Sequence, residues 1–363
     1  MKKLNMAKVL MPENPNRATM LFGGKMSGIL NWNDIKYPHF YELREELRGL
    51  FWRASEIDMA PDIKQFPSLS EAEQKAFLQI LGGVLSSLDA PQTDIASRIS
   101  QFSTDPSVKS IMATIADQES EHNHSYSYVL SSLVPLNIQN ESFEFGKKSE
   151  IVLKRNERLT EIYNEFAENP TIKTVLKALV ESALLEGLYF YTAFAFFYNL
   201  ARNNKMVVSS TMISYINRDE LQHGRFVSEL FRATLGENPQ YNNEEFIQWV
   251  YEQFEHAVEQ ETAWCRHILT DIDGIDMYEM EGYIKYRANK MLRLMGLEEL
   301  YEDYIDNPMK WIRAYADNFD DTKTDFFEQR NRQYTKASKE NGFGELNTTE
   351  EEVSSDLNGF DDL

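Results

Sequence analysis

The chain has 363 residues, of which 42% are hydrophobic and 12% aromatic, so it can form one large core or two small ones. Its formal net charge of −21 disfavours nucleic-acid binding, which needs clustered positive charge. No run of about 18 apolar residues indicates a membrane span, and the N-terminus lacks the apolar stretch of a signal peptide, so we expect a cytoplasmic protein with no membrane partner.

Helical periodicity dominates the sequence. The predicted helices span residues 38–52, 70–103, 106–133, 149–168, 172–203, 208–235, 243–270 and 277–296. Ser70 followed by Glu73 is typical of a capping box at the start of the second helix. Alternating strand patterns are scarce, so the sequence predicts an all-α bundle.

The two ends of the chain differ from this helical middle. Residues 1–30 show little periodicity and are expected to form an N-terminal extension, while 31–333 form the main domain. Residues 334–363 are acidic and poor in large apolar side chains, which predicts a flexible tail. Phe360 and Leu363 are apolar anchors in that tail. From composition alone, a tail that docks on a partner and a tail that only aids solubility are equally open.

The motif Glu-x-x-His occurs on two apolar helical faces, as Glu119 with His122 and as Glu220 with His223. Positions i and i+3 lie on one side of a helix, so each motif aims a carboxylate and an imidazole at one point. Ferritin-like bundles with di-iron or di-manganese sites carry this motif on two helices and one further carboxylate on each of two others. The motif therefore suggests a dinuclear metal site in the core.

A third match, Glu121 with His124, overlaps the first in a shifted register. The face through Glu119 and His122 continues into apolar residues, namely Val108, Ile111, Met112, Ile115, Val129, Leu130 and Leu133. The face through Glu121 and His124 is mainly polar. We therefore expect Glu119 and His122 to point inward and the other pair to point to solvent. A buried Glu–His or Glu–Arg pair without metal remains the alternative for either motif alone.

Two further acids lie on apolar helices and are candidates for the remaining carboxylates, Asp89 and Glu186. The predicted metal ligands are then Asp89, Glu119, His122, Glu186, Glu220 and His223. Carboxylates with two imidazoles suit iron or manganese, and the absence of thiolate ligands argues against zinc structural sites and iron–sulfur clusters.

A phenol is expected beside the metal, because Tyr126 lies one turn beyond His122 on the same face. Phe190, Phe194 and Ile216 share helical faces with the predicted ligands and would form an apolar pocket around it. Such a stripe is usually only core packing. Beside an oxidising metal pair, it would also exclude water from a reactive species.

The ordered set of motifs resembles the small, radical-generating subunit of class I ribonucleotide reductase along nearly the whole chain. The matching residues are Asp89, Glu119-x-x-His122-x-x-x-Tyr126, Glu186-x-x-x-Phe190 and Arg218-Asp219-Glu220-x-x-His223. The short stretch between Glu119 and Glu186, and Phe51-Trp52 after Asn31-Trp32-Asn33, are more similar to class Ib than to class Ia.

This resemblance implies a homodimer with a dinuclear iron site, or alternatively a dimanganese or manganese–iron site. Oxygen, or an oxidant from a flavodoxin-like activase, would oxidise the metal pair, which would then leave a stored radical on Tyr126. A separate large subunit would hold the nucleotide and the thiols and would reduce ribonucleotides to deoxyribonucleotides. The single cysteine, Cys265, fits this division, because this chain cannot supply a pair of redox thiols.

The resemblance also implies a radical-transfer route. Trp52, Asp219 and His122 occupy the positions that start this route, and Tyr334 is the candidate relay in the tail. Phe360 and Leu363 would contact the large subunit. The 29 residues that follow Tyr334 form an unusually long segment for the family.

Three other classes of protein fit parts of the pattern. Another di-iron carboxylate oxidase, such as an acyl desaturase or a hydrocarbon oxidase, would have no use for Tyr126 or for the Trp52–Asp219 pair. A ferroxidase or iron-storage bundle is normally much shorter. A helical interaction protein without metal would leave six potential ligands on apolar faces unexplained.

Overall fold

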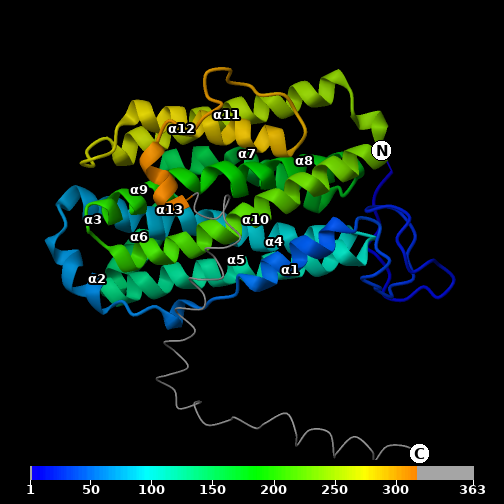
Figure 1. Ribbon diagram of the computed structural model, residues 1–363, viewed down its shortest axis with the longest axis horizontal. Coiled ribbons are helices and arrows are strands. Elements are labelled where there is room, and N and C mark those ends of the chain that lie inside the picture. The colour runs from blue at the N-terminus through cyan, green and yellow to red at the C-terminus, as the bar shows by residue number, and fades with distance from the viewer. Residues whose placement is uncertain (1, 317–363) are drawn as a thin grey trace, which may run out of the picture. The chain divides into compact units, whose positions relative to one another are not determined.

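The structure, a computed structural model, describes residues 2–316, and the described chain is helical apart from loops and one isolated antiparallel bridge between Phe22 and Ser103 (Figure 1). The long helices are α1 (His39–Gly49), α3 (Glu71–Gln79), α4 (Ser86–Phe102), α5 (Pro106–Leu133), α6 (Leu136–Lys148), α7 (Glu150–Glu168), α8 (Ile172–Leu184), α9 (Tyr191–Arg202), α10 (Val207–Glu237), α11 (Glu244–Leu269) and α12 (Met277–Leu294). The shorter elements are α2 (Ala60–Gln65), α13 (Arg313–Ala316), the 3₁₀ turns η1 (Ala54–Glu56), η2 (Phe66–Ser68), η5 (Pro239–Tyr241) and η6 (Lys310–Ile312), and the π-helical turns η3 (Ile80–Leu85) and η4 (Leu185–Tyr189). The predicted all-α fold is confirmed.

Helices α4, α5, α8 and α10 lie at the centre of the bundle. Helix α4 packs along α5, and α10 packs against both α8 and α9. Helices α7, α11 and α12 cover this centre on one side, and α1 lies across α5 and α10 on the other (Figure 1). Apolar side chains from these helices form one continuous core.

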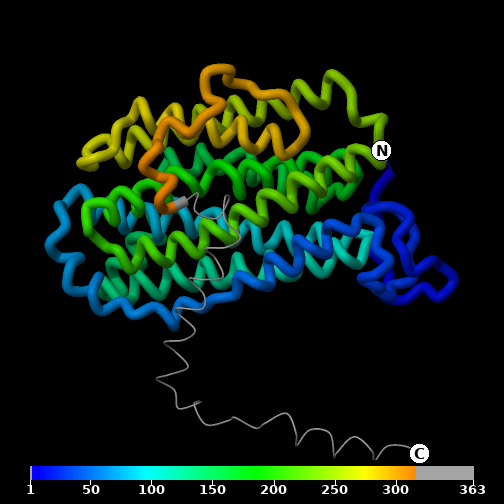
Figure 2. Tube along the Cα trace, viewed as in Figure 1, coloured from blue at the N-terminus to red at the C-terminus, as the bar shows by residue number. Residues whose placement is uncertain are grey.

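The N-terminal segment runs across one end of the bundle, beside the connection from α10 to α11 (Figure 2). The backbone N–H of Leu4 donates to Pro170 O at 2.7 Å, and the N–H of Leu21 donates to a carboxylate oxygen of Glu237 at 2.8 Å. These contacts fix the extension to the helical domain.

Helix boundaries follow local capping chemistry. At the start of α3, Ser70 Oγ accepts from Glu73 N at 3.2 Å and Glu73 Oε2 accepts from Ser70 N at 3.0 Å, which confirms the predicted capping box. The carboxylate of Asp105 caps α5 by accepting from Ser107 N at 2.8 Å, and Pro106 takes the first helical position, where no backbone N–H is needed.

Two predicted helices were wrong in detail, because π-helical turns interrupt them. The segment 70–103 divides into α3, η3 and α4, and the segment 172–203 divides into α8, η4 and α9. At η3, a Cβ on Gly82 would lie 2.5 Å from Ser142 Cβ of α6, so the glycine permits the close approach of α6.

Helices α2 and α6 were missed. Of the residues of α6, only Ser142 is fully buried, so this helix lacks a long apolar stripe.

One helical stretch, Ile172–Arg202, is apolar and long enough to cross a membrane by length and composition alone. Its most apolar window is completely buried inside the bundle, as in the core helix of a globular protein. Tyr334, Phe360 and Leu363 lie outside the described residues.

Candidate metal centre

The six predicted ligands converge in the middle of the bundle. Asp89 comes from α4, Glu119 and His122 from α5, Glu186 from η4, and Glu220 and His223 from α10, and all six side chains are fully buried. Their ligand atoms form two overlapping groups, and within each group these atoms lie within 4.8 Å of one another. One group is Asp89, Glu119, His122 and Glu220, and the other is Glu119, Glu186, Glu220 and His223.

Glu119 and Glu220 belong to both groups. Asp89 and Glu186 each belong to one group only. Each group offers three carboxylates and one imidazole, which is a donor set suited to iron or manganese.

Each imidazole turns Nδ1 toward the carboxylates of the cluster and Nε2 away from the cluster. His122 Nδ1 lies 3.0 Å from Glu220 Oε1, and His223 Nδ1 lies 3.0 Å from Glu119 Oε1 and 3.3 Å from Glu186 Oε2. On the far side, His122 Nε2 lies 3.2 Å from Asp219 Oδ2. A polar partner behind a histidine fixes the ring orientation of a metal ligand.

Although these nitrogen–oxygen distances are short, several buried ligand atoms have no partner with hydrogen-bond geometry among the described residues. These atoms are Asp89 Oδ2, Glu119 Oε2, His122 Nδ1, Glu186 Oε2 and both carboxylate oxygens of Glu220. Buried polar atoms are rarely left unpaired, because desolvation then has no compensation. Two divalent cations would satisfy these atoms and neutralise four carboxylates, so the residues present fit a dinuclear metal site.

Electrostatics within the cluster support the same interpretation. Burial, and then the charge of Glu119, raises the pKa of the Asp89 carboxyl, while burial with neighbouring carboxylates also raises the pKa of Glu119 and of Glu220. Glu186 is the exception: burial opposes its ionisation, but the charge of His223 and several hydrogen bonds lower the pKa of its carboxyl. Anions held this closely favour protonation or a bound cation.

Tyr126 lies next to this cluster and is fully buried. Its hydroxyl donates a hydrogen bond to Asp89 Oδ1 at 3.1 Å. Burial and the adjacent carboxylates raise the pKa of the phenol well above its ordinary value, so it stays protonated. Phe190, Phe194 and Ile216 are completely buried, and the two phenylalanine rings stack with centroids 5.7 Å apart.

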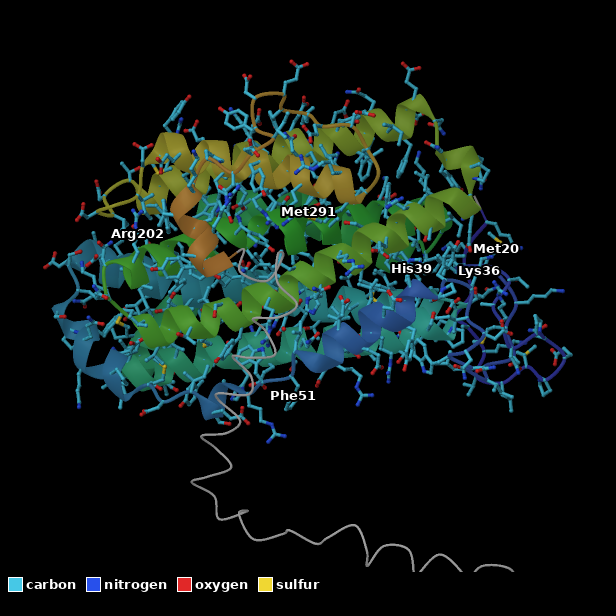
Figure 3. The ribbon with its side chains drawn as sticks, in the orientation of Figure 1. Met20, Lys36, His39, Phe51, Arg202 and Met291 are labelled. Carbon is cyan, nitrogen blue, oxygen red and sulfur yellow. The ribbon has the colours of Figure 1, made fainter. Side chains whose placement is uncertain are left out.

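Trp52 connects the cluster to the bundle surface. Its indole Nε1 donates to Asp219 Oδ2 at 2.8 Å, and the same oxygen faces His122 Nε2. The rings of Trp52 and His122 are nearly parallel, with centroids 6.1 Å apart. Trp52 and Asp219 line a cavity of about 290 Å³ together with Phe51. Phe51, which Figure 3 labels, is 60% exposed.

The two registers of the first motif separate as predicted for Glu119, His122 and His124, whereas the Glu121 side chain is only 29% exposed. Glu119 and His122 are buried, whereas the His124 side chain is 59% exposed. Glu121 Oε1 accepts from the backbone N–H of Ala54 at 2.7 Å and therefore holds the turn η1.

Four polar residues behind the ligands were not anticipated from the sequence. Gln92 Nε2 donates to Glu186 Oε1, and Gln118 Oε1 lies 3.0 Å from His223 Nε2. The Tyr163 hydroxyl donates to Gln92 Oε1 at 2.8 Å and lies 3.0 Å from Ser182 Oγ. Only the spacing of Gln92, one turn after Asp89, could have indicated a position near the metal site.

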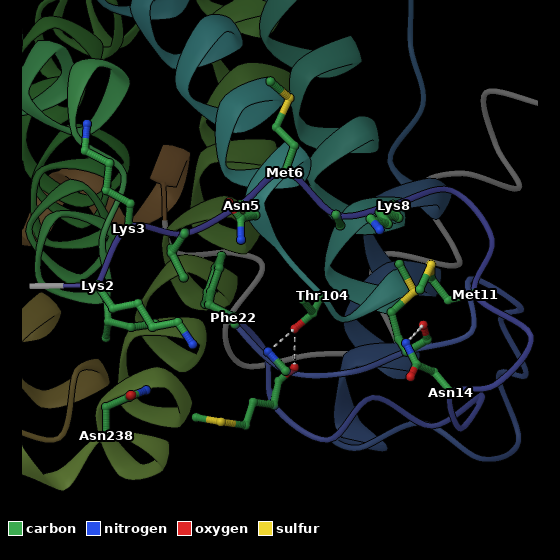
Figure 4. A pocket seen from close by; sticks show the side chains of 17 residues that line it. Lys2, Lys3, Asn5, Met6, Lys8, Met11, Asn14, Phe22, Thr104 and Asn238 are labelled. Atoms are coloured by element: carbon green, nitrogen blue, oxygen red, sulfur yellow. Dashed lines mark hydrogen bonds between the residues drawn. The ribbon is translucent and has the colours of Figure 1, made fainter.

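A second cavity, of about 360 Å³, lies under the N-terminal segment (Figure 4). Lys2, Lys3 and Asn238 are among its lining residues, and the whole lining contains no acidic residue and no histidine. Thr104 Oγ1 donates to Met20 O at 2.6 Å beside it, which holds the loop in place (Figure 4). This cavity therefore offers no ligands of the kind found in the buried cluster.

The family model for "Ribonucleotide reductase, small chain" matches residues 29–308, and this stretch contains all six clustered ligands. The chain belongs to the ribonucleotide reductase small-chain family. The ribonucleoside-diphosphate reductase subunit beta of Halalkalibacterium halodurans is 46% identical over 347 residues, which cover 95% of this chain and 100% of that protein.

Solved structures of this reductase family share the fold. The R2 subunit from Clostridium botulinum superposes with a TM-score of 0.84 at 31% identity, over 87% of this chain and 99% of that one. The dimanganese(II) NrdF protein of Streptococcus sanguinis gives a TM-score of 0.72 at 25% identity, over 79% of this chain and 99% of that one. The NrdF neighbour supports the expected closeness to class Ib.

Proposed function

We propose that this small subunit of ribonucleoside-diphosphate reductase holds two metal ions in the buried cluster and stores a radical on Tyr126. The radical would pass to the large subunit, which would reduce ribonucleotides to deoxyribonucleotides. The observation that supports this most strongly is the meeting of two metal-binding groups, which share Glu119 and Glu220, with a buried phenol bonded to Asp89. We further propose that the protein acts as a homodimer in the cytoplasm.

The six ligands named above would hold the metal pair, and a pair of iron or manganese ions in this place supplies the one-electron oxidation of a phenol. When Tyr126 loses an electron, its hydroxyl proton can move to Asp89 Oδ1, the acceptor of its hydrogen bond. Tyr126 is itself fully buried, and Phe190, Phe194 and Ile216 would form an apolar pocket that excludes water and so protects the neutral radical on Tyr126 from quenching.

Trp52 and Asp219 provide the exit route in this proposal. The Trp52 indole is hydrogen-bonded through Asp219 to His122, and its cavity opens beside the exposed Phe51. Tyr334 would continue the route in the C-terminal tail, residues 334–363, which we propose to dock on the large subunit through Phe360 and Leu363.

Iron is our first choice of metal, with dimanganese and manganese–iron as alternatives. Both metals accept oxygen and imidazole ligands, so the donor set does not separate them. The Streptococcus sanguinis neighbour is a dimanganese(II) protein, which supports the dimanganese alternative. For a manganese form we propose a flavodoxin-like activase as a partner.

A matched pair of histidine variants tests the site. We expect His122→Ala to weaken binding of at least one metal ion by more than about 100-fold, because it removes a buried ligand. His124→Ala, two residues away on the exposed face of α5, should bind two ions per chain like the wild type. Anaerobic titration with ferrous or manganous ions, read by metal analysis after gel filtration, gives both numbers. Equal losses in the two variants would refute the assigned register.

Deletion of residues 344–363 tests the role of the tail. The truncated chain should bind two metal ions as the wild type does but should bind the cognate large subunit at least about tenfold more weakly, because its apolar anchors are gone. Surface plasmon resonance against the large subunit measures this difference. Unchanged affinity would mean that the tail only aids solubility.

A further inference from the structure

Glu186 is carried by an irregular piece of backbone, the π-helical turn η4 between α8 and α9. A π-helical turn departs from the regular α-helical hydrogen-bond ladder and is frequent at functional sites. Two buried arginines from other helices donate to carbonyl groups of this turn. Arg287 Nε of α12 donates to Gly187 O at 2.9 Å, and an Nη of Arg155 of α7 donates to Tyr189 O at 2.6 Å.

Arg155 is held in place by its own buried network. Its guanidinium is paired with Glu261 of α11, and both side chains are fully buried. The other carboxylate oxygen of Glu261 accepts from Thr192 Oγ1 and from Trp264 Nε1, each at 2.7 Å. A buried ion pair is stable only when such hydrogen bonds satisfy its remaining atoms. The network therefore gives Arg155 one defined position against the turn.

Helix α12 holds the turn at a second point, one helical turn beyond Arg287. A Cβ on Gly187 would lie 2.1 Å from Met291 Sδ, so the methionine side chain packs directly on this glycine (Figure 3 labels Met291 on α12). A Cβ on Gly224 of α10 would lie 3.4 Å from Met291 Cε and 3.5 Å from Glu186 Cβ. The turn is thus enclosed by α7, α10 and α12, with little room for Glu186 to move.

We propose that Arg155 and Arg287 are positioning residues, which act through the η4 backbone to set where the Glu186 carboxylate lies. This inference rests on the proposed dinuclear site and concerns one half of it. Glu186 belongs only to the group that contains His223, whereas the group of Asp89 and His122 does not include it. Release of the turn should therefore weaken one metal ion selectively and leave the other bound.

The test is an anaerobic Mn(II) titration of the full chain, with bound ions counted and the spin-coupled signal of the pair read by electron paramagnetic resonance. Arg287→Met should bind the first ion with wild-type affinity and the second at least about tenfold more weakly, with loss of the coupled signal. Arg287→Lys keeps a donor at this position and should recover most of the second-site affinity. Glu261→Gln removes the charge that orients Arg155 and provides a second, milder variant with the same expected direction.

Val250→Ala is the matched control, since it removes buried volume from α11 at a position 11 residues before Glu261. It should retain two ions of wild-type affinity. Two tight ions in both Arg287→Met and Glu261→Gln would overturn the proposal, as would equal weakening of both ions. A wild-type chain that fails to bind two ions would instead refute the proposed metal site itself, so the two failures are distinguishable.

Discussion

Replacement of Tyr126 by phenylalanine should lower the rate of ribonucleotide reduction at least about 1,000-fold, which corresponds to about 4 kcal/mol in the activation barrier. The substitution removes only the hydroxyl that donates to Asp89 Oδ1, so the protein should fold and should still bind two metal ions. Turnover measured with excess cognate large subunit, together with metal analysis of the same sample, gives both results.

Tyr163→Phe is the matched control. Tyr163 is also a buried phenol near the cluster, but its hydroxyl contacts Gln92 and Ser182 rather than a metal ligand. This variant should keep most of the activity. If turnover survived in Tyr126→Phe but were lost in Tyr163→Phe, the radical would have to be assigned to Tyr163 instead.

Replacement of Trp52 by phenylalanine should separate radical storage from radical use. The phenyl ring has no N–H to donate to Asp219 Oδ2, and it is harder to oxidise than an indole. We expect the amount of radical on Tyr126 to stay within about twofold of the wild type, while turnover falls at least about 100-fold, or about 2.7 kcal/mol. Radical content and nucleotide reduction are measured on the same preparation.

The same substitution at Trp32 controls for the loss of an indole. Trp32 packs against Tyr41 and the Arg44 guanidinium, with ring centroids 5.7 Å apart and the guanidinium 4.9 Å from the indole ring. Trp32→Phe should change neither radical content nor turnover by more than about twofold. An active Trp52→Phe enzyme would mean that the radical leaves the bundle by another path.

Much of the candidate site could be predicted because a charged residue on the otherwise apolar face of an amphipathic helix is easily recognised in the sequence. Glu119 and Glu220 lie on otherwise apolar stripes, and this burial is what distinguishes the inward pair from Glu121 and His124. Predicted helices such as 106–133 match the structure, because long periodic segments bounded by proline and capping residues carry a strong signal.

The remaining features depend on contacts between distant segments. The turns η3 and η4 contain Gly82 and Gly187, where α6 and α12 approach the backbone, and a local sequence pattern does not show such an approach. Gln92 and Gln118 are common residue types on helices, and only the assembled bundle brings them against Glu186 and His223. Arg155 is likewise a charged residue whose burial could not be inferred from its own helix.

The central claim is that a metal pair in this cluster oxidises Tyr126, and electron paramagnetic resonance tests it most directly. The full chain is loaded anaerobically with ferrous iron and exposed to oxygen, and a parallel sample receives manganese and a flavodoxin-like activase. We predict a tyrosyl signal in at least one form, a change of its hyperfine structure with ring-deuterated tyrosine, and its disappearance in Tyr126→Phe. Two metal-loaded forms without a tyrosyl signal, or a signal that persists in Tyr126→Phe, would contradict the account.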